Sequence, residues 1–174
     1  EFGRAIDYRL RSDVKVGTCL SGGIDSSTVA AVASKKYQEK SKEKFVAIHA
    51  KSIEKETDES RYAKLVANQC NLDLNIVEPC SQEFKENIDE VIYTQEEPFG
   101  SPSIFMQYFV MQKAKELGCT VLLDGQGGDE TLLGYEKYFP AAYLEIFKND
   151  GVLRAIKEIK NSNKNNSKMS LKWI

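Results

Sequence analysis

Glycines, hydroxyls and one carboxylate lie together in the segment Leu20-Ser21-Gly22-Gly23-Ile24-Asp25-Ser26-Ser27. Paired glycines let backbone amides approach a phosphate without a Cβ in the way, and the serine hydroxyls are further donors. The Asp25 carboxylate repels phosphate and is better suited to holding Mg²⁺. The sequence lacks the Gly-Lys pair of a Walker A loop. The segment therefore predicts a phosphate-binding loop of another type, whereas a lone Gly-Gly pair would favour a simple turn and helix cap.

Glycines and acids also gather in a second segment, Asp124-Gly125-Gln126-Gly127-Gly128-Asp129-Glu130. Glycines at this density allow the backbone to approach a ligand closely, and the acids that follow can hold a cation. Taken alone, the segment is equally compatible with a flexible surface turn. If it shares an edge with the first loop, Asp25 and Asp129 are expected to bracket one Mg²⁺ that bridges phosphate oxygens.

Both segments follow apolar runs that predict buried strands, and two further runs of this kind lie between them. The four predicted strands lie at residues 14–20, 45–50, 74–77 and 120–124. Helical patterns are predicted at residues 5–11, from Ser27 to about Lys36, from Thr57, from Ser81 and from Ser103 to Gly118. This alternation predicts an α/β fold with an open parallel sheet and helices on both faces.

Ligands of open parallel sheets bind outside the carboxyl ends of the strands. The first loop, Ile48 and His49, and the loop after Asp124 are therefore expected at one edge of the sheet. His49 either touches a nucleotide there or packs against the sheet end. Glu96 and Glu97 either reach a substrate amine or form a solvated pair before Pro98.

The composition is that of one cytosolic domain without a basic or membrane-spanning character. The chain has 174 residues, 41% of them hydrophobic, and a net charge of −2, so no basic field indicates nucleic acid. No apolar run approaches the ~20 residues of a membrane span. The four cysteines form no Cys-x-x-Cys pair and are predicted to be reduced thiols in the cytoplasm. We expect an excerpt of a longer protein, with a domain over 1–150 and a helical extension and polar linker over 151–174 that leads to a missing C-terminal part.

The first loop resembles the pyrophosphate-binding PP-loop, Ser-Gly-Gly-x-Asp-Ser, of the N-type ATP pyrophosphatases. A second set of motifs narrows the resemblance to one family within this group. It consists of Glu96–Ser103, then Gly125-x-Gly-Gly-Asp-Glu, then Gly134-Tyr135. In order and spacing these motifs resemble the synthetase domain of glutamine-hydrolysing asparagine synthetases, from about Arg9 to about Tyr138. The resemblance implies an adenine nucleotide alpha hydrolase-like fold of Rossmann type.

The resemblance also implies a chemistry and the residues for it. ATP would be cleaved between its α- and β-phosphates, a carboxylate (aspartate by default) would be adenylated, and ammonia from glutamine would displace AMP to give an amide. Mg²⁺ ligands would be Asp25 and Asp129. The residues that would line adenosine are Leu20, Ile48, Asp124 and Gly125, and those that would hold pyrophosphate are Ser21, Gly22, Gly23, Ser26 and Ser27.

The sequence departs from the family pattern at Gln126, where asparagine synthetases usually have a glutamate linked to amidation. A neutral amide cannot act as a general base, although Gln126 can still position a substrate by hydrogen bonds. This favours, as an alternative, a paralogue that adenylates another carboxylate, and a nucleotide-binding module without catalysis is a further alternative. The family's N-terminal glutaminase domain, with its cysteine nucleophile, and its catalytic lysine are expected outside these residues.

Overall fold

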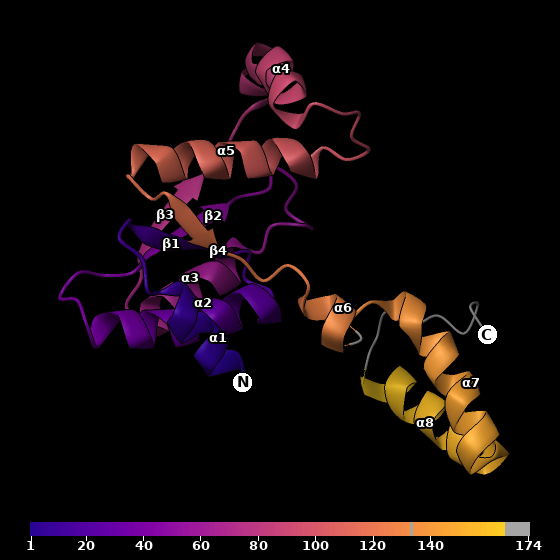
Figure 1. Cartoon of the computed structure of the whole chain (residues 1–174). Helices are drawn as coiled ribbons and strands as arrows, with labels where there is room; N and C mark the ends of the chain where they lie inside the picture. Colours follow the sequence, from indigo (N-terminus) through magenta and orange to yellow (C-terminus); the bar gives the residue numbers. More distant parts are fainter. Residues whose placement is uncertain (133, 166–174) are drawn as a thin grey trace. The chain divides into compact units, whose positions relative to one another are not determined.

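The computed structural model describes residues 1–132 and 134–165, which fall into two compact units, Glu1–Gln126 and Gly127–Ile174. The first unit contains the sheet and the phosphate-loop segment, and the second is helical (Figure 1). The predicted boundary at residue 150 stays a prediction. Among the described helices, none has the length and apolar character needed to cross a membrane.

The first unit is built on a four-stranded sheet in which every strand pairing is parallel. The strands are β1 Val16–Cys19, β2 Val46–Ala50, β3 Asp73–Val77 and β4 Val121–Leu123, in the order β3-β2-β1-β4. This confirms the predicted open parallel sheet. The two central strands carry the first loop and His49 at their carboxyl ends, so the order itself brings these residues together.

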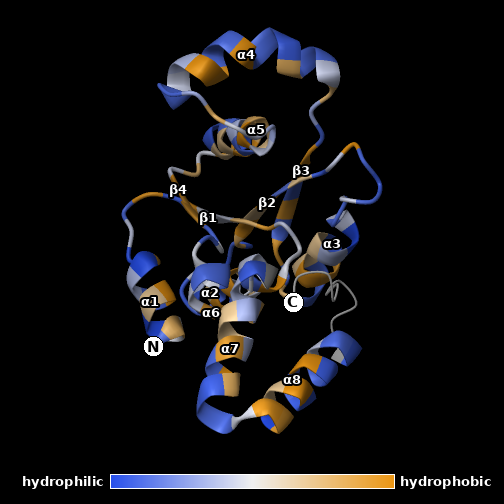
Figure 2. Cartoon of the chain, turned by 90° about the vertical axis from the view of Figure 1, so that its right-hand side faces the viewer, coloured by the Kyte–Doolittle hydropathy of each residue, from blue (hydrophilic) through white to orange (hydrophobic). Residues whose placement is uncertain are grey.

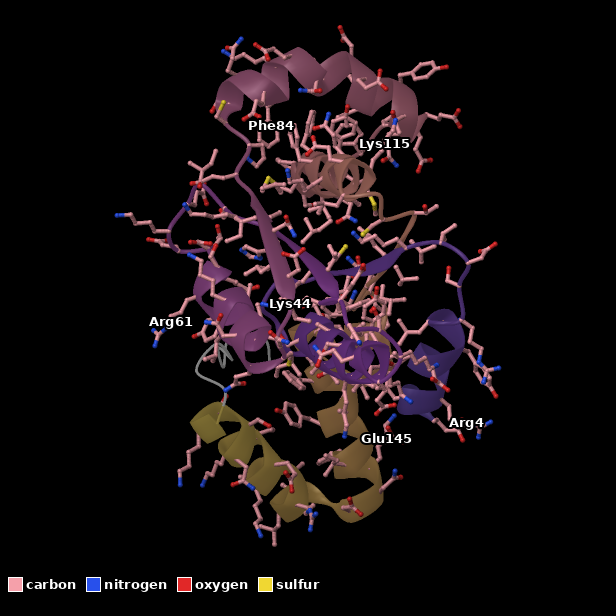
Figure 3. All side chains as sticks on the ribbon, turned by 90° about the vertical axis from the view of Figure 1, so that its left-hand side faces the viewer. Arg4, Lys44, Arg61, Phe84, Lys115 and Glu145 are labelled. Carbon is pink, nitrogen blue, oxygen red and sulfur yellow. The ribbon has the colours of Figure 1, made fainter. Side chains whose placement is uncertain are left out.

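Helices cover both faces of the sheet, as predicted (Figure 1). α1 Phe2–Arg9, α2 Ile24–Gln38 and α3 Ser60–Gln69 lie on one face, and α5 Ser103–Glu116 lies on the other with α4 Ser81–Gln95 packed outside it. Along β2 the side chains alternate between two buried clusters: Ala47 packs on the α2 and α3 side, and Val46 and Ile48 pack on the α5 side. An aromatic contact joins the outer helix to α5, since the ring centroids of Phe84 and Phe105 lie 5.1 Å apart. Figure 3 labels Phe84 on α4.

Several local predictions differ from the structure. The sequence predicts an apolar stripe of Tyr62, Leu65, Val66 and Cys70 on α3. Val66 and Cys70 do pack, partly buried, against the core, but Tyr62 and Leu65 are more than half exposed, and Ala63 and Ala67 are the buried residues of this helix. Small side chains at these positions let α3 approach the sheet closely, which a search for large apolar residues misses. α4 begins at Ser81, as predicted, and its N-cap is Cys80, whose amide donates a hydrogen bond to the Glu83 carboxylate.

The second unit consists of short helices and one helical hairpin. It comprises α6 Gly128–Leu132, the 3₁₀ turn Glu136–Tyr138, α7 Phe139–Asp150 and α8 Val152–Asn165. α7 and α8 meet at Gly151, whose φ of +86° favours glycine, and both helices mix hydrophilic and hydrophobic residues along their length (Figure 2). Residues 161–165, predicted as a polar linker, form the end of α8, and the rest of that linker lies outside the described residues.

Candidate functional site

The first loop begins where the two central strands end. The Leu20 amide donates to the Ile48 carbonyl at 2.9 Å, and both residues are almost fully buried. The Thr18 hydroxyl donates to the Leu123 carbonyl at 3.1 Å, which ties the end of β4 to β1. The predicted loop, Ile48 and the start of the segment at Asp124 therefore lie at the same carboxyl edge of the sheet, as expected.

The loop is folded around the hydroxyl of Ser26. Its Oγ accepts from the Ser21 amide at 3.2 Å, lies 2.8 Å from the Ser21 Oγ, and donates to the Gly23 carbonyl at 3.3 Å. Because Ser26 has one hydroxyl proton and gives it to Gly23, the Ser21 hydroxyl must donate in the contact between the two serines. The Ser21 Oγ in turn accepts from the Gly23 amide at 3.2 Å. Ser26 thus shapes the loop with its hydroxyl already engaged.

The hydroxyl of Ser27, by contrast, does not hydrogen-bond within the described residues. Its Oγ is buried and has no hydrogen-bond partner within the described part of the chain. The helix that follows begins after Gly23, which supplies no side-chain cap, so the amides of its first turn also lack side-chain acceptors. A buried donor without a partner beside an uncapped 15-residue helix fits an anionic ligand such as a phosphate.

Two glycines allow the close packing of this loop. Gly22 has a φ of +103°, and a Cβ there would lie 2.9 Å from the Glu59 carbonyl oxygen in the turn that leads into α3. A Cβ on Gly125 would lie 2.7 Å from the Ser26 amide nitrogen, at the start of α2. The loop therefore lies directly against α3 on one side, and the segment from Asp124 lies directly against α2.

Asp124, which follows β4, interacts with Gln126 and with the Cys19 thiol at the end of β1. The Asp124 carboxylate accepts a hydrogen bond from the Gln126 amide at 3.1 Å. Burial, together with the neighbouring Asp124 charge, raises the pKa of the Cys19 thiol to about 12. Cys19 is thus a neutral thiol at physiological pH, which rules out a thiolate nucleophile at this position.

Asp25 is the acid best suited to hold a cation in the first unit. Its side chain is half-buried, and it forms no ion pair or hydrogen bond with any residue that the structure describes. A carboxylate that is not neutralised by a lysine or arginine can bind Mg²⁺. Over the described ranges, no group of three or more potential ligand side chains forms a metal site on its own. A Mg²⁺ at Asp25 would therefore need further oxygens, such as those of phosphates.

Asp129 belongs to the second unit, and its pairing with Asp25 stays a prediction. It lies in α6, and the Gly134 amide donates to its backbone carbonyl at 3.0 Å. A Cβ on Gly134 would overlap the Asp129 carboxylate, so glycine leaves room for that group. The adjacent Glu130 carboxylate accepts from the Tyr135 hydroxyl at 3.1 Å and raises the pKa of that phenol. Glu130 therefore fixes the following turn.

The segment between α4 and α5 carries the acidic pair that the sequence singled out. Glu96 ends α4 in the left-handed region, with a φ of +59°, and both Glu96 and Glu97 are exposed. They line a surface hollow with Pro98 and Phe99. Contact of this pair with a substrate amine stays a prediction.

The structure adds a contact that the sequence did not indicate. Ser60, the first residue of α3, lies with its Oγ 2.9 Å from the His49 Nε2. The sequence predicts that His49 either touches a nucleotide or packs against the sheet end, and it indicates no contact with Ser60. A buried histidine followed by a serine at a helix start is too common a pattern to signal such a pair.

Comparisons with known proteins agree with this geometry. The sequence model of the family described as Asparagine synthase matches residues 1–172. A putative glutamine-hydrolysing asparagine synthetase 2 of Methanocaldococcus jannaschii is 39% identical over 146 residues, covering 83% of this chain and 27% of that protein. Glutamine-hydrolysing asparagine synthetase 1 of Bacillus subtilis is 30% identical over 144 residues, covering 83% of this chain and 22% of that protein.

Among solved structures, an NH3-dependent NAD synthetase from Campylobacter jejuni matches with a TM-score of 0.49 and 18% identity, over 95% of this chain and 82% of that chain. The chain spans about a quarter of the length of the two asparagine synthetases above.

Proposed function

Because the chain belongs to the asparagine synthase family, whose model covers residues 1–172, we propose that it is the ATP-using part of an amide-forming ligase. One observation of the first unit carries the proposal. The segment Ser21–Ser27 runs from a buried strand into the first turn of an uncapped helix, and the buried Ser27 hydroxyl has no hydrogen-bond partner among the described residues. Such a loop suits the pyrophosphate portion of ATP. Leu20, Ile48, Asp124 and Gly125 would then surround the adenosine.

The proposed reaction has two steps. A substrate carboxylate oxygen attacks the α-phosphorus of ATP, the bond from that phosphorus to the α,β-bridging oxygen breaks, and pyrophosphate leaves. The nitrogen of ammonia or another amine then attacks the acyl carbon, AMP leaves, and the proton lost by the nitrogen passes to solvent or to a basic group. Hydrogen bonds from the loop amides and Ser27 to the leaving pyrophosphate would lower the barrier of the first step, since they meet charge that grows in the transition state.

Mg²⁺ would supply charge neutralisation for the pyrophosphate. Asp25 fits as one ligand because its carboxylate is unpaired among the described residues and lies at the start of α2, beside the loop. We propose Asp129 as a second ligand. The two acids are oxygen donors, which suits a hard cation that keeps several waters and binds phosphates together with one or two carboxylates.

The acceptor carboxylate is the open part of the proposal. Aspartate is the first candidate because the relatives are named asparagine synthetases. Gln126 favours the second candidate, a different carboxylate or amine, because its amide side chain cannot take a proton from an ammonium ion. Glutamine as the nitrogen source, through a separate glutaminase domain, also enters as a proposal, from the words "glutamine-hydrolyzing" in the relatives' names.

The test is ATP–pyrophosphate exchange by the full-length protein with Mg²⁺ and a panel of carboxylates led by aspartate. Exchange that depends on aspartate supports the first candidate, and exchange with another acid alone supports the second. Absence of exchange with ATP still bound supports a nucleotide-binding module without catalysis.

The metal assignment is tested by Asp25→Ala, with Asp89→Ala as the matched control, since Asp89 is an exposed acid on α4. We expect loss of Mg²⁺-dependent exchange in the first variant and full exchange in the second. Unchanged turnover in Asp25→Ala would show that Asp25 is not a ligand of the catalytic ion.

A further inference from the structure

His49 is buried at the carboxyl end of β2, where it contacts the residue before the phosphate-binding loop. Its Nδ1 lies 2.8 Å from the Leu20 carbonyl oxygen, and the residue is only 2% exposed. A carbonyl oxygen can only accept, so Nδ1 must carry the proton of this hydrogen bond. This contact fixes the orientation of the ring and one of its two protonation sites.

The opposite side of the ring contacts the start of α3. The His49 Nε2 lies 2.9 Å from the Ser60 Oγ, and Ser60 is buried as well, at 5% exposure. The Ser60 hydroxyl donates to the Asp58 carboxylate, which also accepts from the Ser60 amide at 3.0 Å. The Leu20 carbonyl is thus connected through one imidazole and one hydroxyl to a carboxylate at the beginning of a helix.

The number of available hydrogens limits which of these contacts can be hydrogen bonds at the same time. The three contacts need three hydrogens, while a neutral imidazole and a serine hydroxyl together supply two. Because a carboxylate can only accept, the Ser60 hydroxyl gives its proton to Asp58. The Asp58 carboxylate also lies near Lys51. The two hydrogen bonds from Ser60, above all the one from its hydroxyl, already hold the pKa of Asp58 below its usual value.

We propose that His49 is a positioning residue that ties the Leu20 carbonyl, at the start of the phosphate-binding loop, to the first turn of α3. A second contact at the same place supports this. Gly22 of the loop lies so close to that turn that a Cβ would be 2.9 Å from the Glu59 oxygen and 3.0 Å from the Ala63 nitrogen. The loop is therefore held against α3 both by its backbone at Gly22 and by the polar connection through His49.

The consequence for ATP rests on the proposed function. A loop held in its binding geometry before ATP arrives loses less conformational freedom on binding. Breaking the connection at Ser60 leaves the Leu20 hydrogen bond and the loop residues themselves unchanged. The expected result is weaker ATP binding with little change in the chemical step.

The variant Ser60→Ala tests this, with Ser34→Ala as a matched control. Ser34 is also buried, at 2% exposure, and its hydroxyl donates to the Ala31 carbonyl within α2 at 3.0 Å. In ATP–pyrophosphate exchange, Ser60→Ala should raise the KM for ATP about tenfold, equivalent to about 1.4 kcal/mol, with kcat unchanged. Ser34→Ala should leave both constants unchanged. Equal KM values in the two variants would overturn the proposal.

A spectroscopic measurement separates this inference from the proposed activity. His49 is the single histidine of the 174-residue chain, so ¹⁵N-labelled histidine gives one imidazole to follow by NMR. We expect a proton bonded to Nδ1 in the native protein, and a change at Nε2 in Ser60→Ala. A neutral ring protonated only at Nε2 would overturn the connection whether or not the protein turns over ATP. Absent exchange with the expected ring signal would refute the proposed function alone.

Discussion

Replacing Gly22 with alanine should destabilise the first unit through two separable effects. The φ of +103° at Gly22 is unfavourable for a residue with a Cβ, and this costs about 1–2 kcal/mol. The added methyl group would also lie 2.9 Å from the Glu59 oxygen, 3.0 Å from the Ala63 nitrogen and 3.1 Å from the Tyr62 Cβ. These are backbone and Cβ atoms that cannot rotate away, so overpacking adds about 1–3 kcal/mol. The free energy of unfolding should therefore fall by about 2–5 kcal/mol.

Gly118→Ala supplies the control because it isolates the conformational effect. Gly118 also has a positive φ, +70°, but no atom of residues 1–132 or 134–165 outside its own neighbours lies within 4 Å of the position its Cβ would take. Its replacement should cost about 1–2 kcal/mol and no more. Urea unfolding followed by circular dichroism measures both variants, and the steric part of the Gly22 effect is their difference, about 1–3 kcal/mol. Equal destabilisation in the two variants would refute the close packing of the loop on α3.

Three further predictions follow from individual groups of the first unit. Ser26→Ala should lower the free energy of unfolding in urea by about 1–3 kcal/mol, because it leaves the hydrogen-bond partners of the Ser26 hydroxyl unsatisfied. Ser27→Ala should be neutral or stabilising, because the Ser27 Oγ has no partner among the described residues. A larger loss of stability in Ser27→Ala than in Ser26→Ala would contradict the assigned roles. The hydrogen bonds from Ser60 hold the pKa of Asp58 below 3.8, so the stabilisation by the Asp58 carboxylate is complete above pH 3.8 and is lost as the pH falls through the lower native pKa. Asp58→Asn should therefore lower the Tm most at neutral pH and progressively less in acid. A Tm difference between variant and parent that is independent of pH would disprove this. The exposed Cys80 should react with a thiol reagent in the native protein, while Cys19, half-buried and with a pKa raised to about 12, should react only after unfolding. Labelling of Cys19 in the native protein at the rate of Cys80, located by peptide mapping, would contradict this.

Much of the architecture of the first unit could be predicted because its signals are local. Apolar runs of strand length alternate with helical patterns, and that alternation leads to a parallel sheet with helices on both faces. The glycine at position 118 ends α5 with the positive φ expected of a helix terminus. The apolar stripe predicted for α3 is confirmed at Val66 and Cys70, which pack against the core, and wrong at Tyr62 and Leu65, which are exposed. Close helix–sheet packing selects the small residues Ala63 and Ala67 for the buried positions.

The residues of the candidate site could be proposed from their types and spacing, but their separate roles could not. Ser26 and Ser27 are neighbours of the same type, yet one hydroxyl organises the loop and the other has no partner in the part of the chain that the structure describes. The difference arises because successive residues of a helix point in directions about 100° apart, and only the folded loop determines which of them meets Ser21.

By itself, the sequence determined which functional groups follow the strands: the glycines and hydroxyls of a phosphate-binding loop after one strand, and a glycine-rich acidic segment after another. It also determined the likeness to one enzyme family. These follow from residue types and short spacings, which survive without knowledge of the fold. Only the tertiary structure decided that His49 joins Leu20 to Ser60 and that Gly22 packs on α3. Such contacts link residues on different elements, and their distances depend on how strands and helices pack, which no local pattern encodes.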